Sequence, residues 1–264
     1  MDNRTKVAVI GITTFVIALA VSHAAYAADE MVEQCKKITI AGSTQWPPYT
    51  IVEEDTGNIS GAGIELAEQI LQELDVPVEK VLFDDKLKML HALNSGGIDL
   101  VVSTYSYAEL EEVADILKPA FTSDPITVLL ARKKIIELEN WESLAGQHGI
   151  MSYDFVVDDE TNSYFTHYLQ IDNNGSLLNM LQKVKNKKYD YAVGSYQQLL
   201  YAIKANNLQT ELSVSKQLSK GGGVHMAFSK TSVCHHYAAY VRKRLQDYKN
   251  NGKVEKILTQ YKQK

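Results

Sequence analysis

The sequence is poor in the patterns that mark metal proteins and most enzymes. Its seven histidines are scattered, and none of their spacings is typical of a zinc site. His235 and His236 are neighbours on a predicted helix, so they cannot face one metal ion together. A Gly-x-Ser-x-Gly motif, a phosphate-binding loop and a Cys–His pair are also missing. These absences favour a protein that is not an enzyme and that uses no metal and no cofactor.

Excess positive charge is missing as well. The 27 Lys and Arg residues are outnumbered by 32 Asp and Glu residues, and the formal net charge is −5. Basic residues cluster at 183–188 and 242–244, where they fit solvated helix faces. The sequence therefore gives no reason to expect nucleic-acid binding.

The N-terminal apolar run is too short for a membrane-spanning helix. Residues 7–21 contain one glycine and two threonines, whereas a span needs about 20 residues. Arg4 and Lys6 precede the run, and Ala25-Tyr26-Ala27 follows it as a small-x-small cleavage site. We therefore predict a signal peptide over residues 1–27 and a periplasmic protein. A retained membrane anchor is the alternative.

Cysteine occurs only twice, as Cys35 and Cys234. Two cysteines in an exported chain predict one disulfide bond, and two free thiols are the alternative. Such a bond would close a loop of nearly the whole mature chain. On a chain-entropy argument, that closure stabilises the fold by roughly 4–5 kcal/mol.

The first half of the mature chain alternates strands and helices. Strands are predicted at residues 37–41, 78–83 and 98–102, and amphipathic helices lie between them at 63–74 and 86–93. A β-α-β-α-β order implies a parallel sheet with right-handed crossovers.

The order changes after residue 121, and no internal repeat stands out. The predicted strands are 126–131, 149–151, 191–193 and 224–228, and the predicted helices are 177–184, 196–204, 237–248 and 254–261. Glycines 221 to 223 are the strongest signal in the sequence for a flexible segment between elements.

This order predicts two α/β lobes joined by two crossings. Residues 28–121 and 224–264 would form lobe 1, and residues 122–223 would form lobe 2. The chain would cross near residues 120–124 and return near 220–224. Two crossing strands beside three glycines are what a hinge that closes on a ligand requires.

Several short motifs follow one another along the chain. They are Trp46-x-Pro48-Tyr49, Leu93-x-x-Gly96-x-Ile98-Asp99, Asp115-x-x-x-Pro119, Leu144-x-Gly146, Tyr189-Asp190 and Gly252-x-Val254-x-x-Ile257. In the order and spacing of these motifs, the chain resembles the solute-binding proteins of ABC transporters, in the polar amino-acid (family 3) group. The resemblance covers roughly residues 37–262.

The resemblance implies a two-lobe periplasmic-binding-protein fold of type II, with parallel-rich sheets and a two-strand hinge. It also implies a monomer that binds a small-molecule solute and delivers it to an ABC permease. Both cysteines would lie at the end of lobe 1 away from the ligand. A Cys35–Cys234 bond there would be structural rather than redox-active.

Three positions depart from the pattern of amino-acid binders in this family. Those proteins hold the α-carboxylate with an Arg, where this chain has Leu110. They usually hold the α-ammonium with an Asp, where this chain has Ser195. The Gly-Thr pair at the mouth of lobe 2 falls on Asp154-Phe155. A zwitterion that leaves water needs a protein partner for each of its two charged groups, so we predict a ligand other than a standard free amino acid. Lys86 or Asp154 could substitute from other positions.

Aromatic and hydroxyl side chains are expected in the cleft, where rings could stack a planar or cationic group. We expect the loop at residues 43–49 to be hard to bury, because it contains two prolines. The alternative is that some of these rings pack between helices and never meet a ligand. The predicted ligand-binding residues are Trp46, Tyr49, Ser103, Tyr105, Tyr153, Asp154 and Ser195.

Two other functions stay open. The chain could be a sensor or partner-binding protein with a decayed cleft that binds nothing. It could also be an enzyme similar to cyclohexadienyl dehydratase, although dicarboxylate substrates should still need the cationic anchor that Leu110 replaces.

Overall fold

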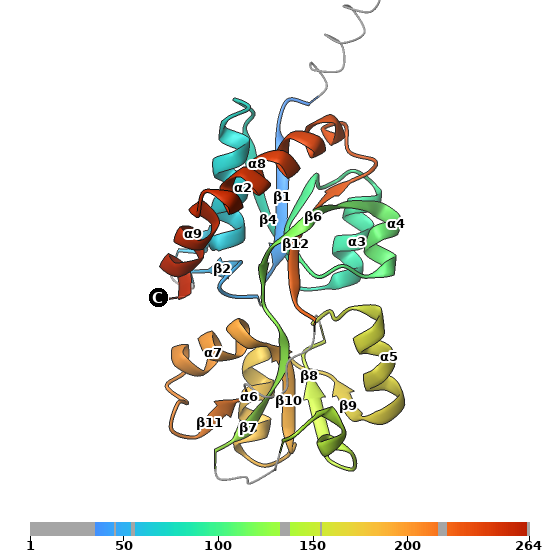
Figure 1. Cartoon of the computed structure of the whole chain (residues 1–264), viewed down its shortest axis with the longest axis vertical. Helices are drawn as coiled ribbons and strands as arrows, with labels where there is room; N and C mark the ends of the chain where they lie inside the picture. Colours follow the sequence, from blue (N-terminus) through green and yellow to red (C-terminus); the bar gives the residue numbers. More distant parts are fainter. Residues whose placement is uncertain are drawn as a thin grey trace, which may run out of the picture.

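A computed structural model describes residues 35–44, 46–53, 56–132, 138–153, 155–215 and 221–262. The predicted signal peptide and Asp154 lie outside these residues. The elements form two units, one above the other, and each is built on a five-stranded sheet (Figure 1). Among the helices that the structure describes, none is long and apolar enough to cross a membrane.

The sheet of the first unit has the order β4-β1-β5-β12-β6. Strands β4 and β5 pair parallel to β1, as the β-α-β-α-β order predicts, whereas β12 runs antiparallel to β5 and β6. The strand bounds are β1 Ile38–Ser43, β4 Val78–Phe83, β5 Leu100–Thr104, β6 Ala114–Ser123 and β12 Gly223–Ser229. A two-stranded sheet, β2 Ile51–Val52 with β3 Ile59–Ser60, lies beside it.

Helices cover both faces of the first sheet. Helices α2, α8 and α9 pack on one face and α3 and α4 on the other, which gives two separate apolar cores (Figure 1). The bounds are α2 Ala62–Gln72, α3 Lys86–Asn94, α4 Ala108–Val113, a 3-10 turn at His235–Tyr237, α8 Ala238–Asn250 and α9 Lys253–Lys262.

The sheet of the second unit has the order β11-β7-β10-β8-β9. Strand β8 is parallel to β10 and β9, and β7 is antiparallel to β10 and β11. Its strands are β7 Ile126–Ala131, β8 His148–Met151, β9 Gln170–Asn173, β10 Tyr191–Ser195 and β11 Leu212–Val214. Its helices are a 3-10 turn at Trp141–Leu144, α5 Asp159–Tyr168, α6 Leu177–Lys185 and α7 Tyr196–Ala205.

The apolar pattern of the sequence does not reveal α5, β9 and β11. Helix α5 buries only Thr161 and Phe165, so its apolar stripe is too thin to detect. Local capping defines its start instead, because Asp158 accepts a hydrogen bond from the Thr161 amide at 2.9 Å.

Two crossings join the units at neighbouring positions. Strands β6 and β12 pair up to Ser123 and Gly223, and the Asp124 amide donates to the Gly222 carbonyl at 2.7 Å. The division into lobes at residues 120–124 and 220–224 stays a prediction, because strand pairing does not measure independent motion.

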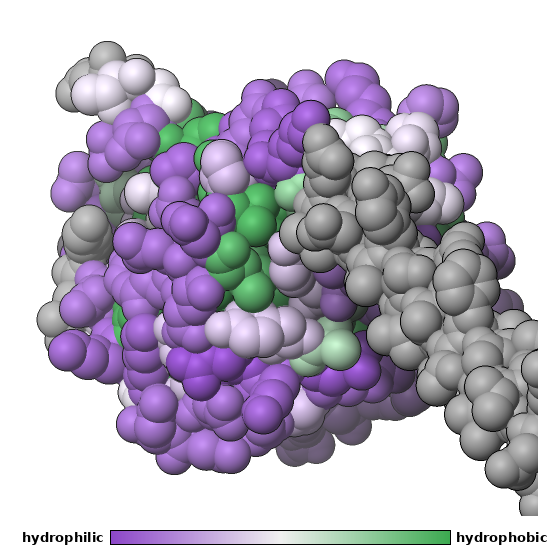
Figure 2. Space-filling view, turned by 90° about the horizontal axis from the view of Figure 1, so that it is seen from above, coloured by the Kyte–Doolittle hydropathy of each residue, from purple (hydrophilic) through white to green (hydrophobic). Residues whose placement is uncertain are grey.

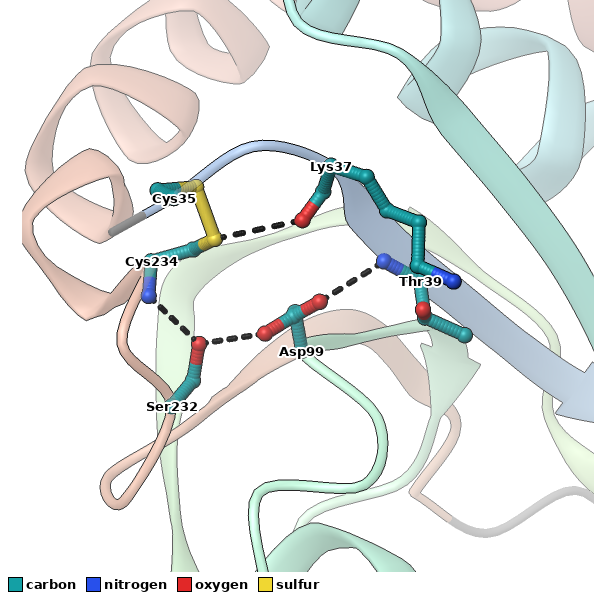
Figure 3. The surroundings of a disulfide bond; sticks show 6 residues. All are labelled: Cys35, Lys37, Thr39, Asp99, Ser232 and Cys234. Atoms are coloured by element: carbon teal, nitrogen blue, oxygen red, sulfur yellow. Dashed lines mark hydrogen bonds between the residues drawn. A yellow bond between two sulfur atoms is a disulfide. The ribbon is translucent and has the colours of Figure 1, made fainter. Parts of the chain in front are cut away.

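The predicted disulfide is present between Cys35 and Cys234, at the start of β1. Asp99 reinforces it, since its carboxylate accepts from the Thr39 amide at 2.7 Å and from the Ser232 hydroxyl (Figure 3). The Ser232 oxygen in turn accepts from the Cys234 amide at 2.9 Å. The bond therefore lies at the opposite end of β1 from the strand's carboxyl end, where the two units meet.

Figure 2 looks onto this far end of the first unit. The visible surface is mainly hydrophilic, and hydrophobic residues gather in a narrow strip near its middle.

We predict that replacing both cysteines with serine lowers the melting temperature without preventing ligand binding. The bond joins residues 199 apart in sequence, and losing that loop closure costs up to about 4–5 kcal/mol. Thermal unfolding with and without dithiothreitol tests this. Reductant should lower the melting temperature of the wild type and leave the double variant unchanged. Equal melting temperatures for all four samples would contradict a structural role.

Candidate functional site

A cavity lies between the two units, at the carboxyl ends of β1, β4 and β5. The volume open to the centre of a water molecule is about 40 Å³. The first unit supplies most of the wall, and the second supplies three residues. The lining residues are Ser43, Trp46, Phe83, Asp85, Lys86, Met89, Ser103, Thr104 and Tyr105, with Phe155, Val156 and Gln198 from the second unit.

Trp46 links the two units directly. Its indole Nε1 donates to Ser195 Oγ at 3.1 Å, and both side chains are buried. Ser195 is also the N-cap of α7, where its Oγ accepts from the Gln198 amide at 3.3 Å. A side chain of the first unit thus adds a donor to a helix cap of the second.

The rings around Trp46 pack against one another. Trp46 lies edge-on to Tyr49 at 5.3 Å between centroids and tilted to Tyr105 at 4.9 Å. Tyr105 meets Phe155 of the second unit at 6.2 Å, edge to face. Such offset aromatic pairs are favourable beyond their buried area. In this conformation these rings form a contact between the two units.

The expectation that the proline-rich loop is hard to bury is wrong. Tyr49 is 0% exposed and Trp46 is 8% exposed. The prolines make burial easier, because each lacks an amide donor that would need a partner. The neighbouring groups are satisfied: the Tyr49 amide donates to the Trp46 carbonyl, and the Pro48 carbonyl accepts from the Ala62 amide.

The predicted ligand-binding residues are not equivalent in the structure. Trp46, Ser103 and Tyr105 line the cavity. Tyr49 and Ser195 are fully buried in the described residues and do not line it. Tyr153 is 46% exposed and lies outside the cavity wall. Contact of any of these residues with a ligand stays a prediction.

Leu110 faces away from the cavity. It is 0% exposed and packs in the core between α3, α4 and the first sheet. Lys86 lines the cavity instead, half-buried, with its Nζ 4.5 Å from the centroid of the Tyr107 ring. Its ion-pair contact with Glu109 is long, at 3.9 Å.

Sequence reasoning missed Asp124, which connects both units and both crossings. Its Oδ1 accepts from the Gln197 amide of α7 at 2.9 Å, and its carbonyl accepts from the Tyr105 hydroxyl at 2.7 Å. Oδ2 is buried without a hydrogen-bond partner among the described residues. A carboxylate directly before Pro125, in the predicted crossing, was the available signal.

Burial controls the ionisation of this group. Desolvation raises the pKa of Asp124 to about 6, against the lowering effect of the hydrogen bond from the Gln197 amide. The pKa of Tyr49 is also raised, first by burial and then by the negative charge of Asp124.

A second contact joins the units at the exposed edge of the cleft. The Ala108 amide at the start of α4 donates to Asp159 Oδ2 of α5 at 3.0 Å. The units therefore meet at a second point, through exposed residues. Within the described ranges, no group of three or more His, Cys, Asp or Glu residues could hold a metal ion.

We predict that Asp124 makes the folded form more stable in mild acid. Its pKa is about 6 when folded and about 4 when unfolded. The contribution is complete below about pH 4 and is lost as the pH rises through 6. Relative to the wild type, Asp124→Asn should gain up to about 3 kcal/mol between pH 4 and 8. Urea unfolding across this range measures the difference.

Asp84→Asn is the matched control, because Asp84 is exposed and its side chain contacts Lys88 only at the surface. It should follow the wild-type profile. An Asp124→Asn profile parallel to the wild type would contradict the assignment.

Several solved structures have a similar fold, and the similarity extends over nearly the whole of their chains. An amino-acid ABC transporter substrate-binding protein from Streptococcus pneumoniae, bound to L-arginine, has a TM-score of 0.73 at 17% identity and covers 89% of this chain and 98% of its own. A histidine kinase sensor domain with similarity to periplasmic binding proteins has a TM-score of 0.71 at 19% identity, covering 87% and 97%. The GluR0 ligand-binding core with L-glutamate has a TM-score of 0.72 at 10% identity, covering 85% and 97%.

These likenesses confirm the predicted periplasmic-binding-protein fold. No protein of curated function is similar enough in sequence to match the chain. The family described as bacterial extracellular solute-binding proteins, family 3, matches residues 38–264. The chain belongs to this family of solute-binding proteins.

Proposed function

We propose that the protein is a periplasmic solute-binding protein that closes its two units on a small solute for an ABC permease. The observation that carries this proposal is the cavity lined by residues of both units, which the Trp46–Ser195 and Ala108–Asp159 hydrogen bonds also join. Contacts of this kind form only when the units come together, so they can couple closure to the contents of the cavity.

The second crossing supports a hinge. Gly221 and Gly222 have φ values of 59° and 99°, a region that favours glycine. A Cβ on Gly222 would lie 2.5 Å from Pro125 Cα and 2.6 Å from the Asp124 carbonyl oxygen. The crossings pack too closely for a side chain here, while the glycines keep the backbone free to rotate.

The solute that we propose is not a standard free amino acid. Leu110, at the position of the expected carboxylate anchor, is a core residue. Ser195, at the position of the expected ammonium anchor, already accepts the indole N–H of Trp46. Neither residue offers a charge to a zwitterion, and an unanswered buried charge is costly.

A sensor role is the second candidate, and the Trp46–Ser195 hydrogen bond is what favours it. The protein's own side chains can hold the units together, as a protein that signals by its conformation would need. No catalytic function is proposed, since the dehydratase alternative has no cationic anchor at Leu110.

Thermal shift against polar, aromatic, aliphatic and peptide solutes tests solute binding. A solute at 100 times its dissociation constant stabilises the fold by about 2.7 kcal/mol, so one chemical class should raise the melting temperature by several degrees. Small-angle scattering should then show compaction with that class. Measuring uptake of the solute by cells separates transport from sensing. Uptake that is lost when the partner permease is deleted indicates transport. If no class of solute raises the melting temperature, the proposal of solute binding is wrong.

We predict that Trp46→Phe shifts the protein toward an open form. The substitution keeps an aromatic ring, although a smaller one, and removes the N–H donor to Ser195; loss of this hydrogen bond costs about 1 kcal/mol. The radius of gyration without solute should rise. Trp141→Phe is the control, because Trp141 Nε1 is buried without a hydrogen-bond partner in the described residues, and its scattering should match the wild type. Unchanged scattering in Trp46→Phe would mean that the indole contact does not hold the units together.

A further inference from the structure

The cavity has a mostly apolar wall with few polar groups. Rings of Trp46, Phe83, Tyr105 and Phe155 line it together with Met89. Such a wall favours an apolar part in any ligand, because apolar surface gains from leaving water. The polar side chains that reach it decide which head group the ligand carries.

Ser103 is the polar side chain that lacks a partner. It is 3% exposed, and its Oγ makes no hydrogen bond to any part of the chain that the structure describes. Neighbouring Thr104, by contrast, donates to the Tyr105 carbonyl at 2.8 Å. A buried hydroxyl without a partner is costly, so a polar atom inside the cavity would satisfy Ser103.

The described residues of the cavity wall carry one charge of each sign. Lys86 is their one Lys or Arg, and its Glu109 partner is 3.9 Å away with 60% of that side chain exposed. Asp85 is their one carboxylate, and its Oδ1 is engaged as the cap of α3, where it accepts from the Lys88 amide at 2.9 Å. Asp124 does not line the cavity. Lys86 is therefore the cationic side chain of this wall that could pair with an anionic ligand.

The size of the cavity limits the ligand to a few heavy atoms. Holding one water takes about 10–15 Å³ of this kind of volume, and the cavity has about 40 Å³. It therefore has room for about three waters in this conformation.

From these four features we propose that the solute is a short-chain aliphatic monocarboxylate, of about two to four carbons, without an ammonium group. The inference rests on the proposed function, because it names the solute of that same site. The carboxylate forms an ion pair with the Lys86 ammonium and accepts a hydrogen bond from the Ser103 hydroxyl. The alkyl chain packs against the rings of Trp46 and Phe155.

Calorimetric titration with propionate and butyrate, in a buffer free of carboxylates, tests the proposal. Propionamide has the same shape as propionate without its charge, and alanine adds the ammonium group. We expect the acids to bind and both of these analogues to bind at least about tenfold more weakly, since a charge-assisted hydrogen bond is roughly twice as strong as a neutral one. Propionamide or alanine binding as tightly as propionate would overturn the proposal.

Variants identify the residues. Lys86→Met keeps an unbranched chain over Tyr107 and removes the charge, so propionate affinity should fall at least about tenfold. Ser103→Ala should weaken propionate by about fivefold. Lys88→Met is the matched control, because Lys88 is exposed and pairs with Asp84, and it should bind like the wild type. Equal affinity in Lys86→Met and the wild type, with equal melting temperatures, would remove Lys86 from the site.

The two proposals fail in different ways. If another solute class binds and compacts the protein, the monocarboxylate inference is wrong and the solute-binding function stands. If no solute of any class binds or changes the scattering, both are wrong.

Discussion

The arrangement of the two units depends on the buried junction at Asp124. This residue bonds to the second crossing through its amide, to Tyr105 through its carbonyl, and to the start of α7 through its carboxylate. It is the point where the chain leaves the first sheet, so any rotation of the units must change at least one of these contacts. One oxygen of this carboxyl has no hydrogen-bond partner among the described residues, so ionisation makes the observed arrangement costly to hold, because burial penalises the charge.

The contacts around this junction replace the anchors that the family resemblance implies. Ser195 receives its donor from Trp46, and Leu110 completes an apolar core. At both positions, the side chain contacts another part of the protein where the resemblance implies a contact with the ligand. The cavity beside them is small, and the packed rings of Trp46 and Tyr105 form part of its wall.

The sequence predicted the parts of the fold that repeat an apolar period or carry a rare residue. Strand β4 and helices α3 and α6 have predicted bounds within one residue of those observed, and two cysteines permit only one pairing. The site was less predictable. Burial of Asp124 and of the Trp46 loop depends on how the two units meet, which no local pattern encodes. Tyr153 illustrates the opposite case: it is an aromatic residue beside the predicted cleft, yet it is 46% exposed, and its contact with a ligand stays a prediction.

Contacts between the two units would stabilise a closed form even without a ligand, and this fits the small solute that we propose. A ligand shifts a conformational equilibrium only by its difference in affinity for the two forms, and a solute of a few heavy atoms offers few contacts with which to make that difference. If the closed form depended on the ligand alone, so small a solute could not populate it. On the proposal that the units close on such a solute, the Trp46–Ser195 and Ala108–Asp159 hydrogen bonds would supply part of the stabilisation of the closed form, and the contacts of the solute with Ser103 and Lys86 would supply the rest.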